Sequence, residues 1–244
     1  MKKLGLIGYP LSHSFSKQYF QEKFSKEDIQ NYEYELYPLE NMSLFPELLE
    51  KETQLLGLNV TIPYKQSIVL CLDELSEAAK EIGAVNTILI KNGKKIGYNT
   101  DYIGFKQSLI NFVGSEQLQA LVLGTGGASK AVQAVLKSLQ IPFQLVSRHN
   151  SKEAISYQNL PQQDWQTHRL IINTTPLGMY PDIEKFPAIP YELITHEHFL
   201  YDLVYNPEET TFLKKGKEKN AKTKNGLEML CLQAEAAWKI WQGN

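Results

Sequence analysis

The sequence has few cysteines, little net charge and no long apolar run, and each shortage excludes a class of protein. The two cysteines, Cys71 and Cys231, are too few for a disulfide framework or a paired metal motif, and their apolar surroundings predict core thiols. The 25 basic and 27 acidic residues almost cancel, so the basic excess of a nucleic-acid binder is missing. Apolar runs such as residues 120–123 are far too short to span a bilayer. We therefore expect neither nucleic acid nor membrane as a partner.

The N-terminal stretch lacks the length of a signal peptide. Only residues 4–8 separate Met1-Lys2-Lys3 from Tyr9-Pro10, which is too short for the apolar region of such a peptide. We therefore expect a cytoplasmic protein. The five histidines form no ligand pattern with cysteines or acidic residues, so no metal site is predicted.

Short apolar runs alternate with helical patterns, which predicts βα units and a largely parallel sheet. Strands are predicted over residues 4–8, 32–36, 58–62, 85–90, 95–98, 120–123, 142–146, 170–172 and 199–204. Helices are predicted over 44–49, 73–82, 101–113, 128–139 and 227–241, and also around Tyr19, Phe20 and Phe24. A new pattern begins near residue 101, so the 244 residues are expected to form two modest α/β domains.

A glycine-rich turn stands between a predicted strand and a predicted helix. It reads Gly124-Thr125-Gly126-Gly127-Ala128-Ser129. Gly124 permits the tight turn, Gly126 lets a diphosphate approach the backbone, and the helix that follows points its free N–H groups at the phosphates. A plain tight turn is the alternative, but the flanking strand and helix favour a dinucleotide site.

The end of the next strand indicates which dinucleotide binds. An NAD site usually places a carboxylate there for the ribose 2′-hydroxyl. This chain has Ser147-Arg148-His149-Asn150, with no carboxylate before Glu153. A guanidinium suits a 2′-phosphate. We predict NADP, with Arg148 on that phosphate and Ser147 or His149 assisting; the alternative is that Arg148 is a solvated surface residue.

Small polar residues gather at the ends of apolar strands, where hydroxyls and amides suit a small polyhydroxylated ligand. The segments are residues 12–16, 59–65, 86–87, 99–101 and 173–176. Each alone is also typical of a turn or a helix cap. That interpretation leaves Lys65 and Asp101 unexplained. An ammonium can stabilise the oxygen that gains or loses a proton during hydride transfer, and a neighbouring carboxylate can orient it.

These segments, in this order, resemble the shikimate dehydrogenase family over almost the whole chain. The most specific is Asn59-Val60-Thr61-Ile62-Pro63-Tyr64-Lys65, which resembles the family's catalytic-lysine segment. The others are residues 8–16, 83–87, 97–101, 124–129, 173–179, 201–207 and 226–234. The resemblance implies NADP-linked interconversion of shikimate and 3-dehydroshikimate in aromatic amino-acid biosynthesis. It also implies a substrate domain (1–100, with the C-terminal helix 226–244 packing back on it), a Rossmann-type dinucleotide domain (101–225), and an active site in the cleft between them.

The resemblance also implies roles for individual residues. Lys65 and Asp101 would be the catalytic pair. Ser14 and Ser16 would hold the substrate carboxylate. The ring and its hydroxyls would be lined by Thr61, Asn86, Tyr205 and Gln233. The cofactor would be bound by Gly124, Gly126, Gly127, Ala128, Ser147, Arg148 and Thr174, with Gly226 and Met229 near the nicotinamide.

The chain departs from the family pattern in two places and has one unusual local feature. Lys17 stands where the family usually has proline, Ser147-Arg148-His149 replaces Asn-Arg-Thr, and six lysines crowd residues 214–224. The lysine-rich segment predicts a solvated face, or else steering of an anionic cofactor. Two alternative functions remain: a quinate/shikimate dehydrogenase using NAD or NADP, and a non-catalytic NADP-binding regulatory protein. A monomer and a homodimer are both compatible with the sequence.

Overall fold

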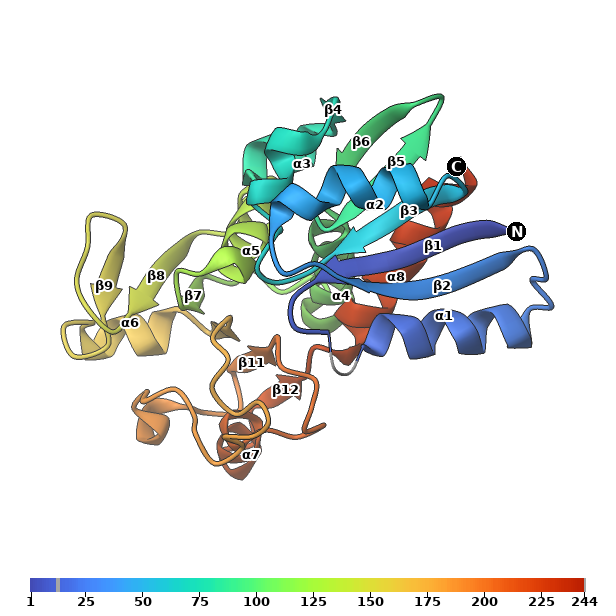
Figure 1. Cartoon of the computed structure of the whole chain (residues 1–244). Coiled ribbons are helices and arrows are strands. Elements are labelled where there is room, and N and C mark those ends of the chain that lie inside the picture. Colours follow the sequence, from blue (N-terminus) through green and yellow to red (C-terminus); the bar gives the residue numbers. More distant parts are fainter. Residues whose placement is uncertain (12–13, 244) are drawn as a thin grey trace. The chain divides into compact units, whose positions relative to one another are not determined.

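The computed structural model describes residues 1–11 and 14–243. The chain forms two compact units, each built on a six-stranded sheet (Figure 1). The first unit combines Met1–Thr100 with Gln233–Asn244, and the second is Asp101–Leu232. Helix α8 (Leu227–Gln242) therefore contributes its first residues to the second unit and the rest to the first.

The sheet of the first unit is mixed. Its strands are β1 (Lys2–Gly8), β2 (Tyr32–Pro38), β3 (Leu55–Val60), β4 (Glu74–Leu75), β5 (Thr87–Lys91) and β6 (Lys94–Tyr98). They lie in the order β2-β1-β3-β5-β6-β4. Strand β1 pairs in parallel with β2 and β3, whereas β5 pairs antiparallel with β3 and β6. Asn92 and Gly93 make the β5–β6 turn with positive φ angles of 53° and 75°, as the sequence predicts for this hairpin.

The helices of the first unit are α1 (Phe15–Lys26), α2 (Phe45–Lys51) and α3 (Glu77–Ile82). Helix α3 begins later than the predicted residue 73, because Ser76 caps it by accepting the Ala79 N–H at 3.3 Å, and residues 74–75 join the sheet. Apolar side chains of α1 and β2 pack with the end of α8, including Phe20 stacked on Tyr34 and tilted against Trp241. The Trp241 Nε1–H donates to the Ile88 carbonyl at 2.9 Å, so α8 is anchored to the sheet.

The sheet of the second unit is entirely parallel. Its strands are β7 (Ala120–Leu123), β8 (Phe143–Ser147), β9 (Ala154–Ser156), β10 (Leu170–Asn173), β11 (Phe199–Asp202) and β12 (Lys222–Lys224). The order β12-β11-β10-β7-β8-β9 reverses at β7, which is the strand order of doubly wound dinucleotide-binding folds. Strands β9 and β12 were not predicted from the sequence.

Four helices belong mainly to the second unit: α4 (Thr100–Val113), α5 (Gly127–Ser138), α6 (Gln162–Thr167) and α7 (Thr211–Glu218). Every residue of β7, β10 and β11 is buried, because apolar clusters cover both faces of the sheet. Buried strands of this kind appear in sequence as continuous apolar runs. Within the described residues, no helix is long and apolar enough to cross a membrane.

Candidate active site

A buried polar network occupies the first unit where β3, β5 and β6 meet the second turn of α8. Asn86 is bound to Thr100 from both ends of its amide, at 3.0 Å through Nδ2 and at 2.6 Å from the Thr100 backbone N–H. The Gln233 Oε1 accepts from Thr100 at 3.3 Å and from Asn86 at 3.5 Å. All three side chains are buried. The structure thus brings together Asn86 and Gln233, which the resemblance places on the substrate.

Asn59, from the predicted polar segment 59–65, and Tyr34, which the sequence did not place in the site, extend this network. Asn59 donates to the Asn86 carbonyl at 3.2 Å and to Thr87 at 3.1 Å. Tyr34 donates to Asn59 at 2.7 Å and also hydrogen-bonds Ser16. Burial raises the pKa of Tyr34 far above its ordinary value. Hydrogen bonds therefore connect Ser16 on α1 with Gln233 on α8. An aromatic residue inside a strand is typical of core, so no sequence signal could have identified Tyr34.

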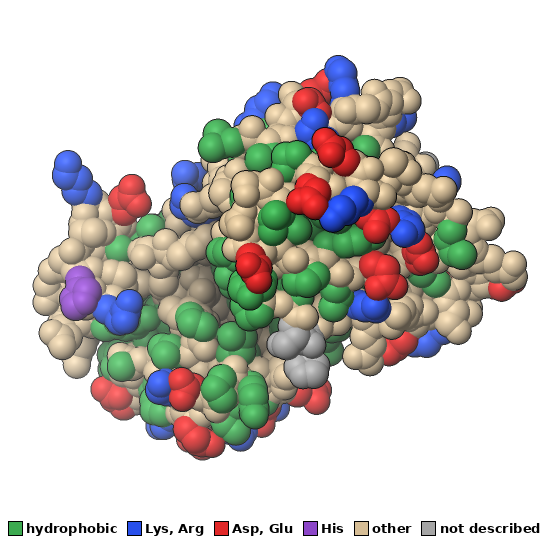
Figure 2. All heavy atoms as spheres, viewed as in Figure 1, with side chains coloured by type: hydrophobic (Ala, Val, Ile, Leu, Met, Phe, Trp, Pro, Cys, Tyr) green, Lys and Arg blue, Asp and Glu red, His purple; other side chains and the backbone are tan. Residues whose placement is uncertain are grey.

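Ser14 and Ser16 lie at the start of α1. Ser14 caps the helix, its Oγ accepting the Lys17 N–H at 3.3 Å. The family usually has proline at this position, and proline has no N–H to donate. The cap is therefore possible only because Lys17 stands there. The Lys17 ammonium is 2.7 Å from Glu35. Figure 2 shows acidic and basic side chains intermingled on the face in view. Ser12 and His13 lie outside the described residues.

The catalytic candidates belong to different units. Lys65 follows β3 and is half-buried, and its carbonyl accepts the Val85 N–H at 2.7 Å. Thr61, in the same connection, donates its backbone N–H to Ile7 at 2.9 Å. Asp101 is the second residue of α4, directly after Thr100 of the network. Because Lys65 lies in the first unit and Asp101 in the second, their meeting stays a prediction.

The glycine-rich turn joins β7 to α5, as the sequence predicts. Gly124 has a φ of +108°, which side chains rarely adopt, and a Cβ there would lie 2.8 Å from the Thr174 Oγ1. Both the backbone conformation and the close contact therefore require glycine. Gly126 and Gly127 have open space where a Cβ would stand, and Gly126 is the N-cap of α5 without a side-chain cap. Ala128 is exposed and Ser129 is buried. Free N–H groups and an open approach fit a dinucleotide diphosphate.

Ser147, Arg148 and His149 stand at the carboxyl end of β8, next to this turn in the sheet. Arg148 is exposed. Burial raises the pKa of Tyr157 to about 12, and the positive charge of Arg148 opposes part of this rise. The Ser147 hydroxyl donates to the His149 carbonyl and so holds the backbone beyond the strand. Nothing acidic follows until Glu153. The residues present therefore fit a 2′-phosphate.

The remaining candidates lie around β10, β11 and α8. Thr174 donates through its hydroxyl to the Leu123 carbonyl at 2.8 Å. Tyr205 is 37% exposed, and partial burial raises its pKa. A Cβ on Gly226 would collide with the Leu203 carbonyl oxygen, so only glycine fits there. Met229 packs on the core of the second unit. Tyr205, Gly226 and Met229 thus belong to the second unit.

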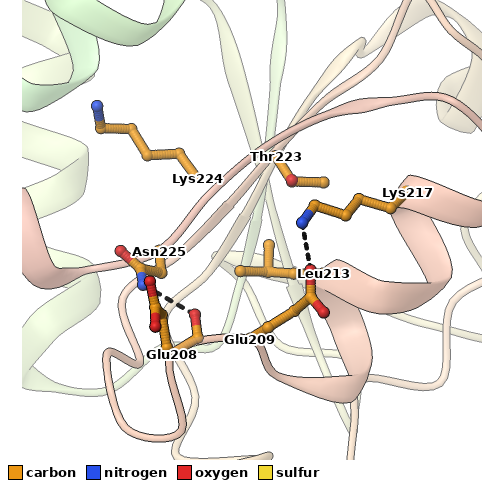
Figure 3. Close-up of a pocket in the computed structure, with 7 residues that line it drawn as sticks. All are labelled: Glu208, Glu209, Leu213, Lys217, Thr223, Lys224 and Asn225. Carbon is orange, nitrogen blue, oxygen red and sulfur yellow. Dashed lines mark hydrogen bonds and ion pairs between the residues drawn. The ribbon is translucent and has the colours of Figure 1, made fainter.

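The lysine-rich segment is only partly a solvated face. Lys222 lies 4.3 Å above the Phe199 ring, and Lys215 lies 4.8 Å above the Phe186 ring. Lys217 pairs with Glu209, and both line a pocket of about 500 Å³ (Figure 3). Lys214 and Lys219 are exposed. Four of the six lysines pack on rings or pair with acids, since Lys224 also pairs with Glu228. Because a ring contact leaves the ammonium charge in place, charge steering rests on Lys214, Lys215, Lys219 and Lys222 rather than on the two acid-paired lysines.

The strand order of the second unit and its glycine-rich turn define an α/β protein with a Rossmann-type unit. Residues 6–88 match the model of the shikimate dehydrogenase substrate binding domain. The chain is 42% identical to "Shikimate dehydrogenase (NADP(+))" of Clostridium beijerinckii, covering 99% of this chain and 92% of that one. For the Methanococcus vannielii protein of the same name the identity is 37%, with 98% and 91% covered.

A solved structure agrees with these relatives. The shikimate 5-dehydrogenase of Thermus thermophilus, in complex with NADP(H) and shikimate, is 31% identical with a TM-score of 0.86, covering 100% of this chain and 94% of that one. The chain belongs to the shikimate dehydrogenase family, as the resemblance implied.

Proposed function

We propose that this protein catalyses the reversible, NADPH-dependent reduction of 3-dehydroshikimate to shikimate in aromatic amino-acid biosynthesis. The observation that carries the proposal is similarity over the full length to proteins named shikimate dehydrogenase (NADP(+)). The open glycine-rich turn and the exposed Arg148 support NADP as the cofactor. The buried amide and hydroxyl network supports a polyhydroxylated substrate.

The proton chemistry is assigned to Lys65 and Asp101. The bound nicotinamide cofactor supplies the hydride chemistry. During reduction the ketone oxygen gains negative charge, which the Lys65 ammonium stabilises before it donates a proton to that oxygen. In the reverse direction the amine accepts the proton of the hydroxyl. The Asp101 carboxylate orients the Lys65 side chain and favours its protonated form at the start of the reduction.

The substrate is held by neutral donors. Ser14 and Ser16 donate hydroxyl hydrogens to the carboxylate from the start of α1, where the helix dipole also favours an anion. Thr61, Asn86, Tyr205 and Gln233 bind the ring hydroxyls. Because Asn86 and Gln233 are already fixed by Thr100, they bind substrate with little loss of side-chain freedom.

The cofactor is held by the second unit. Gly124, Gly126, Gly127 and Ala128 receive the diphosphate, and Ser147 and Arg148 bind the 2′-phosphate. Thr174 also binds the cofactor, and Gly226 and Met229 lie near the nicotinamide. In this proposal residues 1–100 form the substrate domain, on which the C-terminal helix packs back, and residues 101–225 form the dinucleotide domain. Residues 226–232, which lead into that helix and begin it, belong to the second unit. A cytoplasmic location and a monomer or homodimer complete it.

One spectrophotometric assay at the absorbance band of reduced nicotinamide tests the proposal. The purified protein is offered shikimate or quinate with NADP or NAD. We expect turnover of shikimate with NADP. Turnover of quinate would indicate the broader quinate/shikimate dehydrogenase, and binding of NADP without turnover of either substrate would indicate a regulatory protein.

A further inference from the structure

A buried carboxylate ends strand β11 and has no part in the proposed chemistry. Asp202 is fully buried, and its oxygens accept three hydrogen bonds. Oδ1 accepts from Asn173 at 2.9 Å and from the Val204 N–H at 3.0 Å. Oδ2 accepts from the Thr210 hydroxyl at 2.6 Å. The three donors lie at the end of β10, after β11 and at the cap of α7, so this one side chain ties together three segments.

The first of these donors leads directly to the glycine-rich turn. Asn173 gives its Nδ2 to Asp202, while its Oδ1 accepts the Thr175 N–H at 3.0 Å and the Thr175 hydroxyl at 2.6 Å. Thr174 and Thr175 carry the atoms that a Cβ on Gly124 would meet, at 2.8 Å and 3.0 Å. Asp202 therefore fixes Asn173, and Asn173 fixes Thr175, which packs on the turn. Its neighbour Thr174 is held separately by the Leu123 carbonyl.

The other two donors hold the two ends of the segment that carries Tyr205. The Val204 N–H and the Thr210 hydroxyl stand on either side of residues 205–209, and both end on Asp202. Thr210 also caps α7 by accepting the Leu213 N–H at 3.4 Å. A carboxylate has no hydrogen to donate, so ionised Asp202 suits a position surrounded by donors.

We propose that Asp202 is a positioning residue for NADP binding, acting through Asn173 and Thr175 on the glycine-rich turn. This inference rests on the proposed function only in taking that turn as the diphosphate site. Among the described residues, Asp202 hydrogen-bonds Asn173, Val204 and Thr210 and no residue of the turn. Its effect is on cofactor affinity, with a smaller effect on the substrate through Tyr205.

The test is the dissociation constant of NADP, measured by calorimetry on Asp202→Ala. Residues that act through others change ligand affinity by about 2- to 30-fold, and we expect a rise of about 3- to 30-fold. Asp202→Asn should restore affinity to within about twofold of wild type, because its Oδ1 keeps both N–H donors and its Nδ2 can donate to Thr210. An unchanged constant in Asp202→Ala, or an equal loss in Asp202→Asn, would overturn the proposal.

His198 provides the matched control. It stands just before β11, at the opposite end of the strand from Asp202, and is also buried. It bonds the Trp165 carbonyl at 2.9 Å and accepts the Thr195 N–H at 3.1 Å. His198→Ala should lower stability while leaving NADP affinity within about twofold. If it weakens NADP as much as Asp202→Ala does, the effect is general loosening and the proposal fails.

Asn173→Ala keeps the proposal testable if Asp202→Ala does not fold, because it removes the connection and leaves Asp202 two donors. It should weaken NADP by a similar factor, and unchanged affinity would refute the route through Asn173. Wild-type protein that binds no NADP would refute the proposed function instead. The two failures are therefore distinguishable.

Discussion

Both ends of the Asn86 amide bind Thr100: its Nδ2 donates to the Thr100 hydroxyl, and its Oδ1 accepts the Thr100 backbone N–H. The bond from the Thr100 backbone N–H is the shorter, at 2.6 Å. Asp101 is the next residue in the chain. The backbone that leads to the predicted catalytic carboxylate is thereby fixed to the substrate unit, by the same side chain that is proposed to bind a ring hydroxyl.

Removing the Lys65 ammonium should lower kcat. We expect Lys65→Ala to lose about 10²–10⁴-fold in kcat, the usual range for a proton-transfer group, with the KM for NADP little changed. Lys91→Ala, an exposed lysine of the same unit, is the control. Steady-state kinetics measure both, and a loss below tenfold in a folded Lys65→Ala protein would reduce Lys65 to a positioning role.

Arg148→Ala should remove the preference for NADP. A hydrogen bond to a charged group contributes about 1.5–3 kcal/mol, so kcat/KM with NADP should fall about 10- to 100-fold while the value with NAD stays level. Lys137→Ala near the end of α5 removes an exposed charge elsewhere in the unit. Equal losses with both cofactors would show that Arg148 does not read the 2′-phosphate.

Asp202 should make stability fall as pH rises. Burial raises its pKa to about 6, although hydrogen bonds from Thr210, Val204 and Asn173 oppose this. Between the ordinary pKa of about 4 and about 6, the folded protein keeps a proton that the unfolded chain has lost. The unfolding free energy therefore declines by about 3 kcal/mol across this window, and the loss is complete above it.

Urea unfolding of wild type and Asp202→Asn on both sides of the window measures this. The stability of wild type relative to Asp202→Asn should decrease from low to high pH. A difference that increases with pH, or stays constant, contradicts the assignment.

Glu235 should stabilise the packing of α1 on α8. Its carboxylate accepts from the Tyr19 hydroxyl at 2.5 Å and lies 2.9 Å from the Lys23 ammonium. Burial favours its neutral form, but these bonds outweigh burial and lower its pKa. Glu235→Gln should cost about 1 kcal/mol in unfolding free energy. Glu27→Gln, which removes the more exposed partner of Lys23, should cost less, and the reverse order would contradict this expectation.

The exposed lysines test the steering hypothesis. If Lys214 and Lys219 steer the anionic cofactor, kcat/KM should fall more steeply with ionic strength in wild type than in the double Lys→Gln variant. The measurement is kcat/KM for NADPH over a salt series. Equal slopes would leave these lysines as a solvated face.

The fold was predictable where burial on both faces leaves a continuous apolar run, as in β7 and β10. It was not predictable at the edges of the second sheet. Strands β9 and β12 have three residues each, and Lys222 and Lys224 give β12 a polar pattern that hides the strand. Helix α7 is hidden in the same lysine-rich stretch, because only Phe212, Leu213 and Gly216 are buried.

The sequence predicted the polar character of the candidate site but not its side-chain contacts. Small polar residues at strand ends predict a polar cluster, and Asn86, Thr100 and Gln233 do meet. The partners Tyr34 and Asp202 were missed, because their importance lies in which donors surround them. A single sequence does not state which side chains become neighbours after folding.

The return of α8 to the first unit has a consequence for synthesis. A ribosome synthesises the chain from the N-terminal side. The sheet of the first unit is therefore made more than a hundred residues before α8, which Trp241 anchors to that sheet. During that interval the apolar surface formed by Phe20 and Tyr34 is not yet covered by α8. The second unit, in contrast, is the single continuous segment Asp101–Leu232. Translation therefore completes the second unit before it completes the first, although synthesis of the first unit begins earlier.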